Sequence, residues 1–289
     1  MKTFGILTLA TPKDYQKAIG LALSVRLTNP GVPLAVACSS RTRPLIEPYF
    51  DIIVDEKPEL RGFVHKIHLD QYTPFERTFF FDSDILIFRS LQDVVDNWGD
   101  QPYMACGGYT TDGFSSFGQD RAGVLRKIGR ERLVTIDGAG HCLFRKSECR
   151  DIFELGREIT ANYQEYAGDA RYADEDVMNI AMTILDYLPT PHGDFFSRYL
   201  SARKGTMEMD ASQGRCRFES VAYNRPQEPH MMHFACNEAP FAYYRQLKLI
   251  YEKFGVDTAG LLKTAADDYY DTRINWPLRK FVKRLLGYS

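Results

Sequence analysis

The first 81 residues alternate between short apolar runs and segments of helical periodicity, and this alternation limits the possible folds more than any other feature. The apolar runs are typical of strands, at residues 4–9, 33–38, 51–54 and 78–81. The segments between them are typical of helices, at residues 13–27, 43–49 and 61–71. This order predicts an α/β fold whose mostly parallel sheet is covered by helices on both faces. In such a sheet, ligands bind beyond the carboxyl ends of the strands.

The first predicted helix has a local start signal. Thr11 suits the N-cap position and Pro12 suits the first helical position, so we expect the helix to begin near Lys13. The apolar side chains that recur along it are expected to face inward: Tyr15, Ile19, Leu21, Ala22 and Val25.

The rest of the chain is less regular. Helices are predicted at residues 119–128, 149–161, 175–185, 241–254 and 258–269, and a turn into a strand at residues 136–144. Residues 107–118 are rich in glycine, serine, threonine and tyrosine, and residues 194–223 are expected to be mainly loop. Because no repeat or obvious linker is found, the sequence predicts one domain over residues 1–270 and an appendage over residues 271–289.

Charge and cysteine content narrow the class of protein. The net charge of -2 gives no basic surface, so we expect no nucleic acid partner. The six cysteines lack CxxC spacing, which argues against a zinc or redox site and favours reduced thiols. The N-terminus lacks the pattern of a signal peptide, and no apolar stretch is long enough to span a bilayer. These observations favour a cytoplasmic protein.

The most informative stretch is Asp82-Ser83-Asp84, which lies between two apolar runs at residues 79–81 and 85–88. Buried carboxylates are costly unless they are paired, hydrogen-bonded or bound to metal. Residues two apart on an extended chain point the same way, so Asp82 and Asp84 can face one hard cation such as Mn²⁺ or Mg²⁺. The alternative is a turn at the end of a strand, with Asp84 as a capping residue.

The order of these features resembles glycosyltransferase family 8, which includes glycogenin and bacterial lipooligosaccharide galactosyltransferases. The resemblance runs from about Phe4 to Phe241 and depends on several short motifs in the same order. It implies the GT-A fold of nucleotide-diphospho-sugar transferases, with a mixed, mostly parallel sheet flanked by helices. It also implies a donor that is a nucleotide sugar, mostly a UDP-sugar, a requirement for Mn²⁺, and retention of the anomeric configuration. Such an enzyme would act in lipopolysaccharide or other glycan biosynthesis.

The first shared motif is the run Ile6 to Thr11, followed by Asp14 and Tyr15. The resemblance implies that Leu9, Ala10 and Thr11 meet the nucleobase through backbone groups and that Tyr15 stacks on it. A core aromatic on an amphipathic helix is the alternative for Tyr15.

The second motif is Lys66, sixteen residues before Asp82. The resemblance places a catalytic lysine here, beside the donor phosphates or sugar, and a point positive charge suits a diphosphate. Together with Lys66, the resemblance assigns Asp82, Ser83 and Asp84 to donor binding. A solvated helix lysine is the alternative for Lys66.

The third motif is the turn Gly138-Ala139-Gly140, where the family has an Asn-Ser-Gly-like turn beside the donor sugar. By resemblance, Gly138 and Ala139 contact the donor. The family's asparagine is absent here, and Asp137 is a candidate to replace it.

The fourth motif, residues 172–179, is similar to the family's Asp-Gln-Asp-x-x-Asn. The resemblance implies that Asp174 and Glu175 are catalytic residues beside the reacting sugar, although Glu175 replaces the usual glutamine. These acids also open a predicted helix, where negative charge suits the helix dipole.

The fifth motif, residues 230–236, matches the family's His-Phe-x-Gly at His233, which the resemblance makes the third protein ligand of Mn²⁺ beside Asp82 and Asp84. Cys236 stands in place of the glycine, and Ala239 in place of a lysine that follows the motif. A hydrogen-bonded core residue is the alternative for His233.

The C-terminal residues 276–289 have the pattern of a basic amphipathic helix. Its apolar positions are Leu278, Phe281, Val282 and Leu285, and its basic positions are Arg279, Lys280, Lys283 and Arg284. Such a helix can lie on an anionic membrane, which predicts a peripheral contact with the inner face of the membrane. A helix docked on its own domain, or a dimer contact, is the alternative.

The sequence thus predicts a glycosyltransferase that moves a sugar to a saccharide or glycolipid acceptor, and leaves two alternatives. One is a haloacid-dehalogenase-like phosphatase, which also carries Asp-x-Asp after an apolar strand. The other is a non-catalytic scaffold that binds a nucleotide or a membrane.

Overall fold

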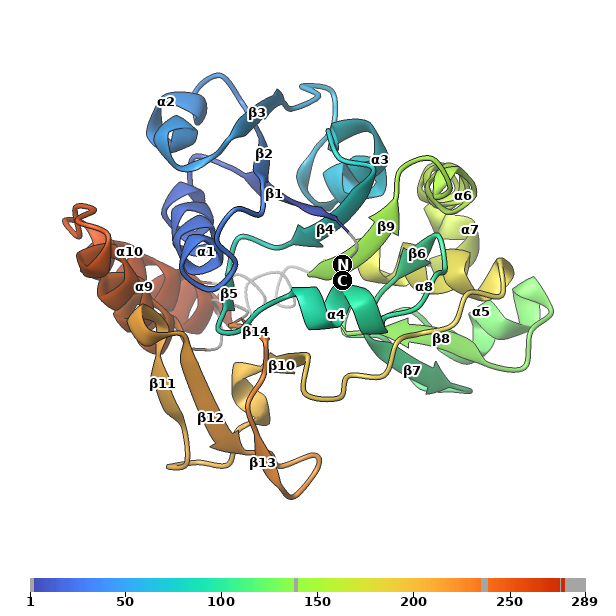
Figure 1. Ribbon diagram of the computed structural model, residues 1–289. Coiled ribbons are helices and arrows are strands. Elements are labelled where there is room, and N and C mark those ends of the chain that lie inside the picture. Colours follow the sequence, from blue (N-terminus) through green and yellow to red (C-terminus); the bar gives the residue numbers. More distant parts are fainter. Residues whose placement is uncertain (1–2, 138–139, 235–238, 276, 279–289) are drawn as a thin grey trace. The chain divides into compact units, whose positions relative to one another are not determined.

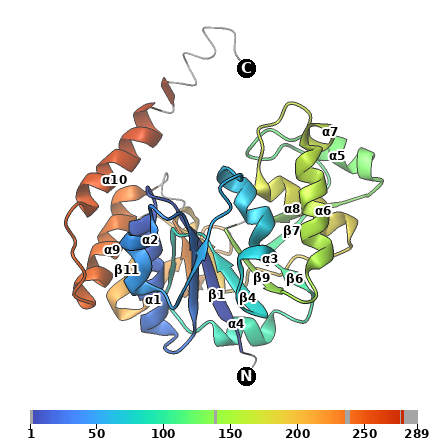
Figure 2. The same ribbon diagram turned by 90° about the horizontal axis from the view of Figure 1, so that it is seen from above.

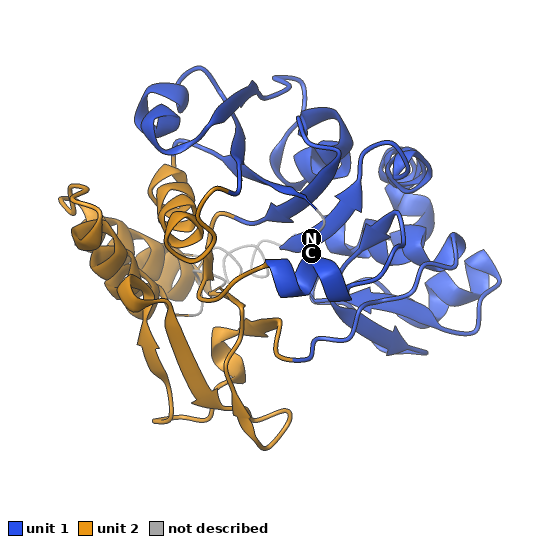
Figure 3. Cartoon of the chain, viewed as in Figure 1, with its two compact units in different colours: residues 1–12, 32–82, 92–193 blue, residues 13–31, 83–91, 194–289 orange. Residues whose placement is uncertain are grey.

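The computed structural model describes residues 3–137, 140–234, 239–275 and 277–278. The chain divides into two compact units, shown in Figure 3. Unit 1 comprises residues 1–12, 32–82 and 92–193, and unit 2 comprises residues 13–31, 83–91 and 194–289. One passage of the chain from unit 1 to unit 2 falls between Asp82 and Ser83, inside the predicted metal motif.

Unit 1 is built on a mixed sheet in which most strands are parallel (Figure 1). Its order is β3-β2-β1-β4-β9-β6. The strands are β1 (Gly5–Ala10), β2 (Leu34–Cys38), β3 (Ile52–Asp55), β4 (Arg77–Phe81), β6 (Tyr103–Met104) and β9 (His141–Arg145). The first four are mutually parallel, and β9 runs antiparallel to both β4 and β6. The carboxyl ends of β1 to β4 therefore meet at one edge, where the sequence predicts a site.

Helices cover this sheet, and a hairpin of β7 (Gly107–Thr110) and β8 (Leu133–Ile136) completes unit 1. Figure 2 shows α6 and α8 side by side. The helices are α2 (Arg43–Ile46), η1 (Glu47–Tyr49), η2 (Gly62–His68), α3 (Leu69–Tyr72), α4 (Gln92–Asn97), α5 (Arg121–Ile128), α6 (Arg150–Ala161), α7 (Tyr163–Ala167) and α8 (Asp174–Ile184).

The helix predicted at residues 61–71 is instead the 3₁₀ helix η2 followed by the short α3. The segment is rich in phenylalanine, valine, isoleucine and histidine, which are weaker α-helix formers than alanine or leucine.

Unit 2 contains two small sheets and its own helices. One sheet has the order β10-β14-β5, and the other the order β11-β12-β13. The strands are β5 (Ile85–Ile87), β10 (Phe196–Arg198), β11 (Glu208–Asp210), β12 (Arg215–Glu219), β13 (Pro226–Gln227) and β14 (Met231–His233). The helices are α1 (Tyr15–Thr28), η3 (Tyr199–Ser201), η4 (Ala211–Gln213), α9 (Pro240–Lys253), α10 (Leu261–Tyr270) and η5 (Asp271–Asn275). The region expected to be mainly loop, residues 194–223, thus contains three strands.

The expected start of the first helix is wrong. Helix α1 begins at Tyr15 with Asp14 as its N-cap residue, and residues 12–14 form a turn. Residues 16–25 of α1 are all buried, including Lys17, so the buried surface of the helix extends beyond the predicted positions. At Gly20 the helix approaches α9 so closely that a Cβ would collide with Leu247.

Five of the cysteines, at 38, 106, 142, 149 and 216, are free and buried, and Cys236 lies outside the described residues. Every described helix falls short of the length and apolarity needed to cross a bilayer. The predicted basic helix at residues 276–289 lies outside the described part of the chain, apart from Pro277 and Leu278.

Candidate active site

Asp82 stands at the carboxyl edge of the unit 1 sheet. It follows β4, which lies between β1 and β9 in the sheet, and its backbone N–H donates to the carbonyl of Gly140 at 2.7 Å. The three phenylalanines that precede it, at 79–81, are fully buried. Their burial fixes the end of the strand, so the Asp82 carboxylate is held where a parallel sheet binds ligands.

Lys66 lies between two acids at this edge. Its Nζ is 2.8 Å from Asp82 Oδ1 and 3.3 Å from Asp174 Oδ2, and only 13% of its side chain is exposed. Burial by itself lowers the pKa of Lys66, but the Asp174 and Asp82 carboxylates more than offset this and hold the pKa above its ordinary value. Lys66 is therefore not a solvated lysine but a fixed positive charge.

Asp174 and Asp176 begin helix α8, and both are buried. Neither caps the helix with its side chain, although the helix dipole favours both charges. Asp176 instead accepts hydrogen bonds from Ser115 Oγ at 2.9 Å and Tyr163 OH at 3.2 Å. The sequence had not assigned a role to Asp176 or its partners. The hydrogen bonds of Asp176 join α8 to the loop before α5 and to α7.

Glu175, between these two acids, is half-buried. Burial raises the pKa of Glu175 to about 7, and the neighbouring charges of Asp176, Asp174 and Asp137 act in the same direction. Glu175 can therefore take up or release a proton near neutral pH, which the glutamine usual in the family cannot do.

Asp137, the candidate replacement for the family's asparagine, follows β8 and has a partner that the sequence did not indicate. His192 Nε2 lies 2.5 Å from Asp137 Oδ2. Gly138 and Ala139, the other residues predicted at the donor sugar, lie outside the described residues.

The predicted nucleobase segment is divided between the units. Leu9 and Ala10 end β1 in unit 1, and Thr11 follows them with an exposed side chain. Tyr15 begins α1 in unit 2 and is half-buried, so it is not a fully buried core aromatic.

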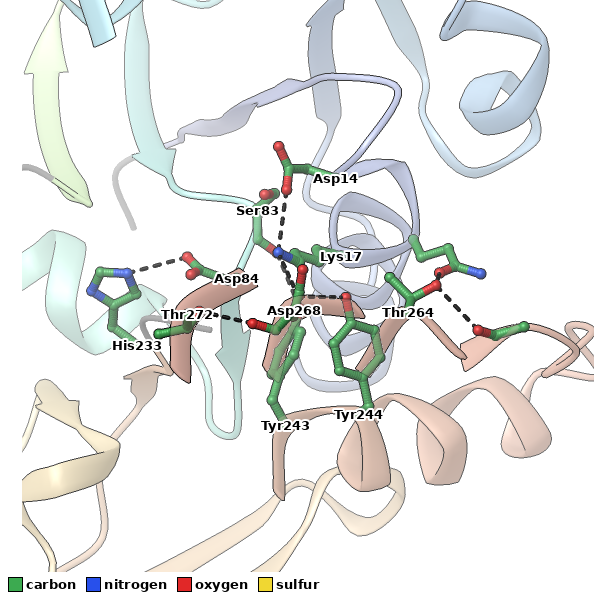
Figure 4. Close-up of polar contacts among 12 residues, drawn as sticks. Asp14, Lys17, Ser83, Asp84, His233, Tyr243, Tyr244, Thr264, Asp268 and Thr272 are labelled. Carbon is green, nitrogen blue, oxygen red and sulfur yellow. Dashed lines mark hydrogen bonds and ion pairs between the residues drawn. The ribbon is translucent and has the colours of Figure 1, made fainter. Parts of the chain in front are cut away.

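Asp84 and His233 come together within unit 2, as Figure 4 shows. Strand β14 pairs with β5 so that His233 lies opposite Ile85, the residue after Asp84. His233 Nε2 is 3.1 Å from Asp84 Oδ1, and both side chains are mostly buried. The carbonyl of the adjacent Ser83 accepts a hydrogen bond from Tyr243 OH at 3.4 Å. A carboxylate and an imidazole that converge in this way suit a divalent cation such as Mn²⁺.

A second buried lysine lies in unit 2 (Figure 4). Lys17 Nζ is 3.2 Å from Asp14 Oδ1 and 3.1 Å from Asp268 Oδ2. Asp268 also accepts a hydrogen bond from Tyr244 OH at 3.0 Å. These contacts tie the first turn of α1 to α9 and α10.

No protein-family model and no curated protein matches the chain. Solved structures of several glycosyltransferases match the chain. Galactosyltransferase LgtC, in complex with donor and acceptor sugar analogues, matches with a TM-score of 0.58 and 18% identity over 86% of this chain and 95% of LgtC. The bifunctional glycosyltransferase WbbM matches with a TM-score of 0.57 and 12% identity over 91% of this chain and 51% of WbbM. GlyE of Streptococcus pneumoniae TIGR4 matches with a TM-score of 0.55 and 14% identity over 91% of this chain and 63% of GlyE. The predicted GT-A fold, similar to that of family 8 enzymes, is confirmed.

Proposed function

We propose that this chain, which has the GT-A fold, is a metal-dependent glycosyltransferase that moves a sugar from a nucleotide-diphosphate donor to an acceptor. The observation that carries the proposal is the buried Lys66 between Asp82 and Asp174 at the carboxyl edge of the sheet. A buried, fixed cation beside acids suits a reaction whose leaving group is a diphosphate.

In this proposal Asp82, Asp84 and His233 hold Mn²⁺ or Mg²⁺. Asp84 and His233 already converge at 3.1 Å. Asp82 is two residues before Asp84, so the chain itself keeps their Cα atoms within about 7 Å of each other. When bound, the metal would supply Lewis-acid stabilisation of the departing diphosphate.

Side chains and backbone groups of the protein would bind the donor. Lys66 would contact the diphosphate, and Asp174 and Asp82 keep Lys66 protonated. Leu9, Ala10, Thr11 and Tyr15 would bind the nucleobase, Ser83, Gly138 and Ala139 would complete the donor site, and Asp174 and Glu175 would lie beside the sugar. The family resemblance favours UDP as the nucleotide and retention of configuration.

The acceptor is proposed to be a saccharide or a glycolipid. The LgtC structure contains donor and acceptor sugar analogues, which supports an acceptor of this class. The matching structures share the GT-A fold, so the phosphatase alternative has no structural support.

We place the protein in the cytoplasm, where residues 276–289 would attach it to the inner face of the membrane. Removal of the residues after Asn275 is expected to abolish sedimentation with vesicles of anionic phospholipid and to leave donor hydrolysis unchanged. Vesicle binding that survives the deletion contradicts the membrane contact.

The proposed function is tested by thermal unfolding with nucleoside diphosphates, with and without Mn²⁺, followed by assays of nucleotide-sugar hydrolysis. A ligand at about 100 times its Kd stabilises the native state by about 2.7 kcal/mol. We expect UDP to raise the melting temperature only with Mn²⁺, and UDP-sugars to be hydrolysed. Binding without hydrolysis would support the scaffold alternative, and the absence of any shift would contradict the proposed donor.

A further inference from the structure

Phe63 lies beside Lys66 because both belong to the 3₁₀ helix η2. Such a helix has three residues per turn, so the side chains at positions i and i+3 lie above one another. The Nζ of Lys66 accordingly lies over the Phe63 ring, 5.5 Å from its centroid. The same Nζ is 3.3 Å from Asp174 Oδ2, so the Phe63 ring lies within about 9 Å of a proposed catalytic carboxylate.

Phe117 reaches the same place from the loop before α5. The buried Ser115 fixes this loop, because its Oγ donates to Asp176 and accepts the N–H of Phe117 at 3.2 Å. Phe117 is therefore tied to the acidic first turn of α8. The rings of Phe117 and Phe63 meet edge to face, with centroids 6.3 Å apart and planes at 80°. This is a favourable arrangement of two aromatic rings, so each ring helps to hold the other in position.

Phe63 keeps an exposed surface although it is held in this way. It is 41% exposed, whereas the three phenylalanines at 79–81 are fully buried. An exposed apolar surface beside a polar site is typical of a place that a ligand covers. The faces of aromatic rings are electron-rich and attract positive charge, as Lys66 over Phe63 and Arg171 over Phe117 show. A pyranose ring suits this surface, because one of its faces consists mainly of C–H groups whose hydrogens carry partial positive charge.

We propose that Phe63 and Phe117 form an aromatic platform on which the acceptor sugar stacks, so that the acceptor is a pyranoside bound through an apolar C–H face; this inference rests on the proposed function. The platform lies in unit 1 together with Lys66 and Asp174. An acceptor on the platform is next to the donor sugar that is proposed to lie beside Asp174. Phe63 and Phe117 thus determine which acceptor binds and take no part in the bond changes.

The test measures how the enzyme divides the donor sugar between a saccharide and water. Wild type and Phe63→Ala are incubated with Mn²⁺, UDP-glucose or UDP-galactose, and a neutral disaccharide: lactose, maltose or cellobiose. Covering the exposed part of an aromatic ring contributes about tenfold to affinity. We therefore expect the KM for the disaccharide to rise about 5- to 20-fold in Phe63→Ala. The ratio of transfer to hydrolysis at low acceptor concentration should fall by a similar factor, and Phe63→Tyr, which keeps the ring, should restore it.

The matched control is Tyr109→Ala. Tyr109 is also an aromatic residue of unit 1 that is 41% exposed. It lies opposite Val134, whose N–H donates to Thr183 near the other end of α8 from Asp174. Its removal should leave the ratio of transfer to hydrolysis unchanged. A substitution that only loosens the fold lowers transfer and hydrolysis together and does not change their ratio.

Two results overturn the platform while the proposed function stands. One is a ratio in Phe63→Ala that equals that of wild type or of Tyr109→Ala. The other is a wild-type protein that hydrolyses a nucleotide sugar but transfers to none of the three disaccharides.

Wild-type protein that hydrolyses neither nucleotide sugar counts against the proposed function itself. Saturation-transfer NMR with the same disaccharides then tests the platform separately. A disaccharide that binds wild type and Tyr109→Ala more tightly than Phe63→Ala supports the platform. Equal binding to all three proteins, or binding to none of them, overturns it.

Discussion

The two buried lysines of this chain have the same chemistry and different surroundings. Lys66 in unit 1 and Lys17 in unit 2 each lie between two aspartates, and their side chains are 13% and 10% exposed. The acids around Lys66 belong to the end of a central strand and the start of a helix. The acids around Lys17 belong to the turn before α1 and to α10, where they join helices. Buried charge alone therefore does not identify a site; the place of Lys66 at the carboxyl edge of the sheet is what makes it a candidate.

The largest effect is expected at Asp84, the carboxylate that meets His233. Asp84→Ala removes a proposed metal ligand, whereas Asp268→Ala removes a structural partner of Lys17. Metal chemistry supplies several kcal/mol of transition-state stabilisation, so Mn²⁺-dependent hydrolysis of UDP-sugars should fall by about 10³-fold or more in Asp84→Ala. The Asp268→Ala variant should keep its kcat within about threefold of wild type. Wild-type turnover in Asp84→Ala would refute the proposed metal site.

The next largest effect is expected when the two lysines are compared directly, in the variants Lys66→Met and Lys17→Met. Removal of one preorganised positive charge costs about 10²- to 10³-fold in kcat, and we expect this loss for Lys66→Met alone. Both variants should lose stability, because each leaves carboxylates without their cation. The loss should be about 3–5 kcal/mol for Lys66→Met and smaller for Lys17→Met, whose acids are more exposed and better screened.

Steady-state kinetics and urea unfolding measure these two quantities separately. If Lys17→Met lowers kcat as much as Lys66→Met does, the distinction between a catalytic and a structural cluster is wrong. An unchanged kcat in both variants would remove Lys66 from the proposed mechanism.

The smallest expected effect is a change in how the stability of the folded protein depends on pH, and it concerns Glu175. Its pKa is raised to about 7 in the folded protein, so between the ordinary value of 4.5 and 7 the folded state binds more protons than the unfolded state. Stability from this group therefore falls as pH rises through that interval. Glu175→Gln should be more stable than wild type by about 1–3 kcal/mol at pH 8, with a difference that shrinks toward pH 5. The control is Glu165→Gln, since the Glu165 side chain is 68% exposed.

Urea unfolding at pH 5, 6, 7 and 8 checks this prediction. A stability difference that is constant with pH would mean that Glu175 does not titrate in this range.

Most elements of the fold could be predicted because their signals are local. The apolar runs that became β1 to β4 and the spacing that became α6, α8 and α9 need only neighbouring residues, and the structure places these elements close to the expected ranges. The failures are also local. Thr11 and Pro12 carry a helix start signal, yet α1 begins at Tyr15, and the segment that holds Lys66 is a 3₁₀ helix.

The sequence by itself determined the order of strands and helices, and it indicated Asp82, Asp84, Lys66 and His233 as residues of one site. Only the tertiary structure decided which side chains meet: Lys66 with Asp174, Lys17 with Asp268, and Asp137 with His192. The physical reason is that periodicity records how each segment buries its own apolar face. Contacts between distant segments depend instead on the order of strands in the sheet and on the register of helices against it. Neither can be derived from the local periodicity of apolar residues.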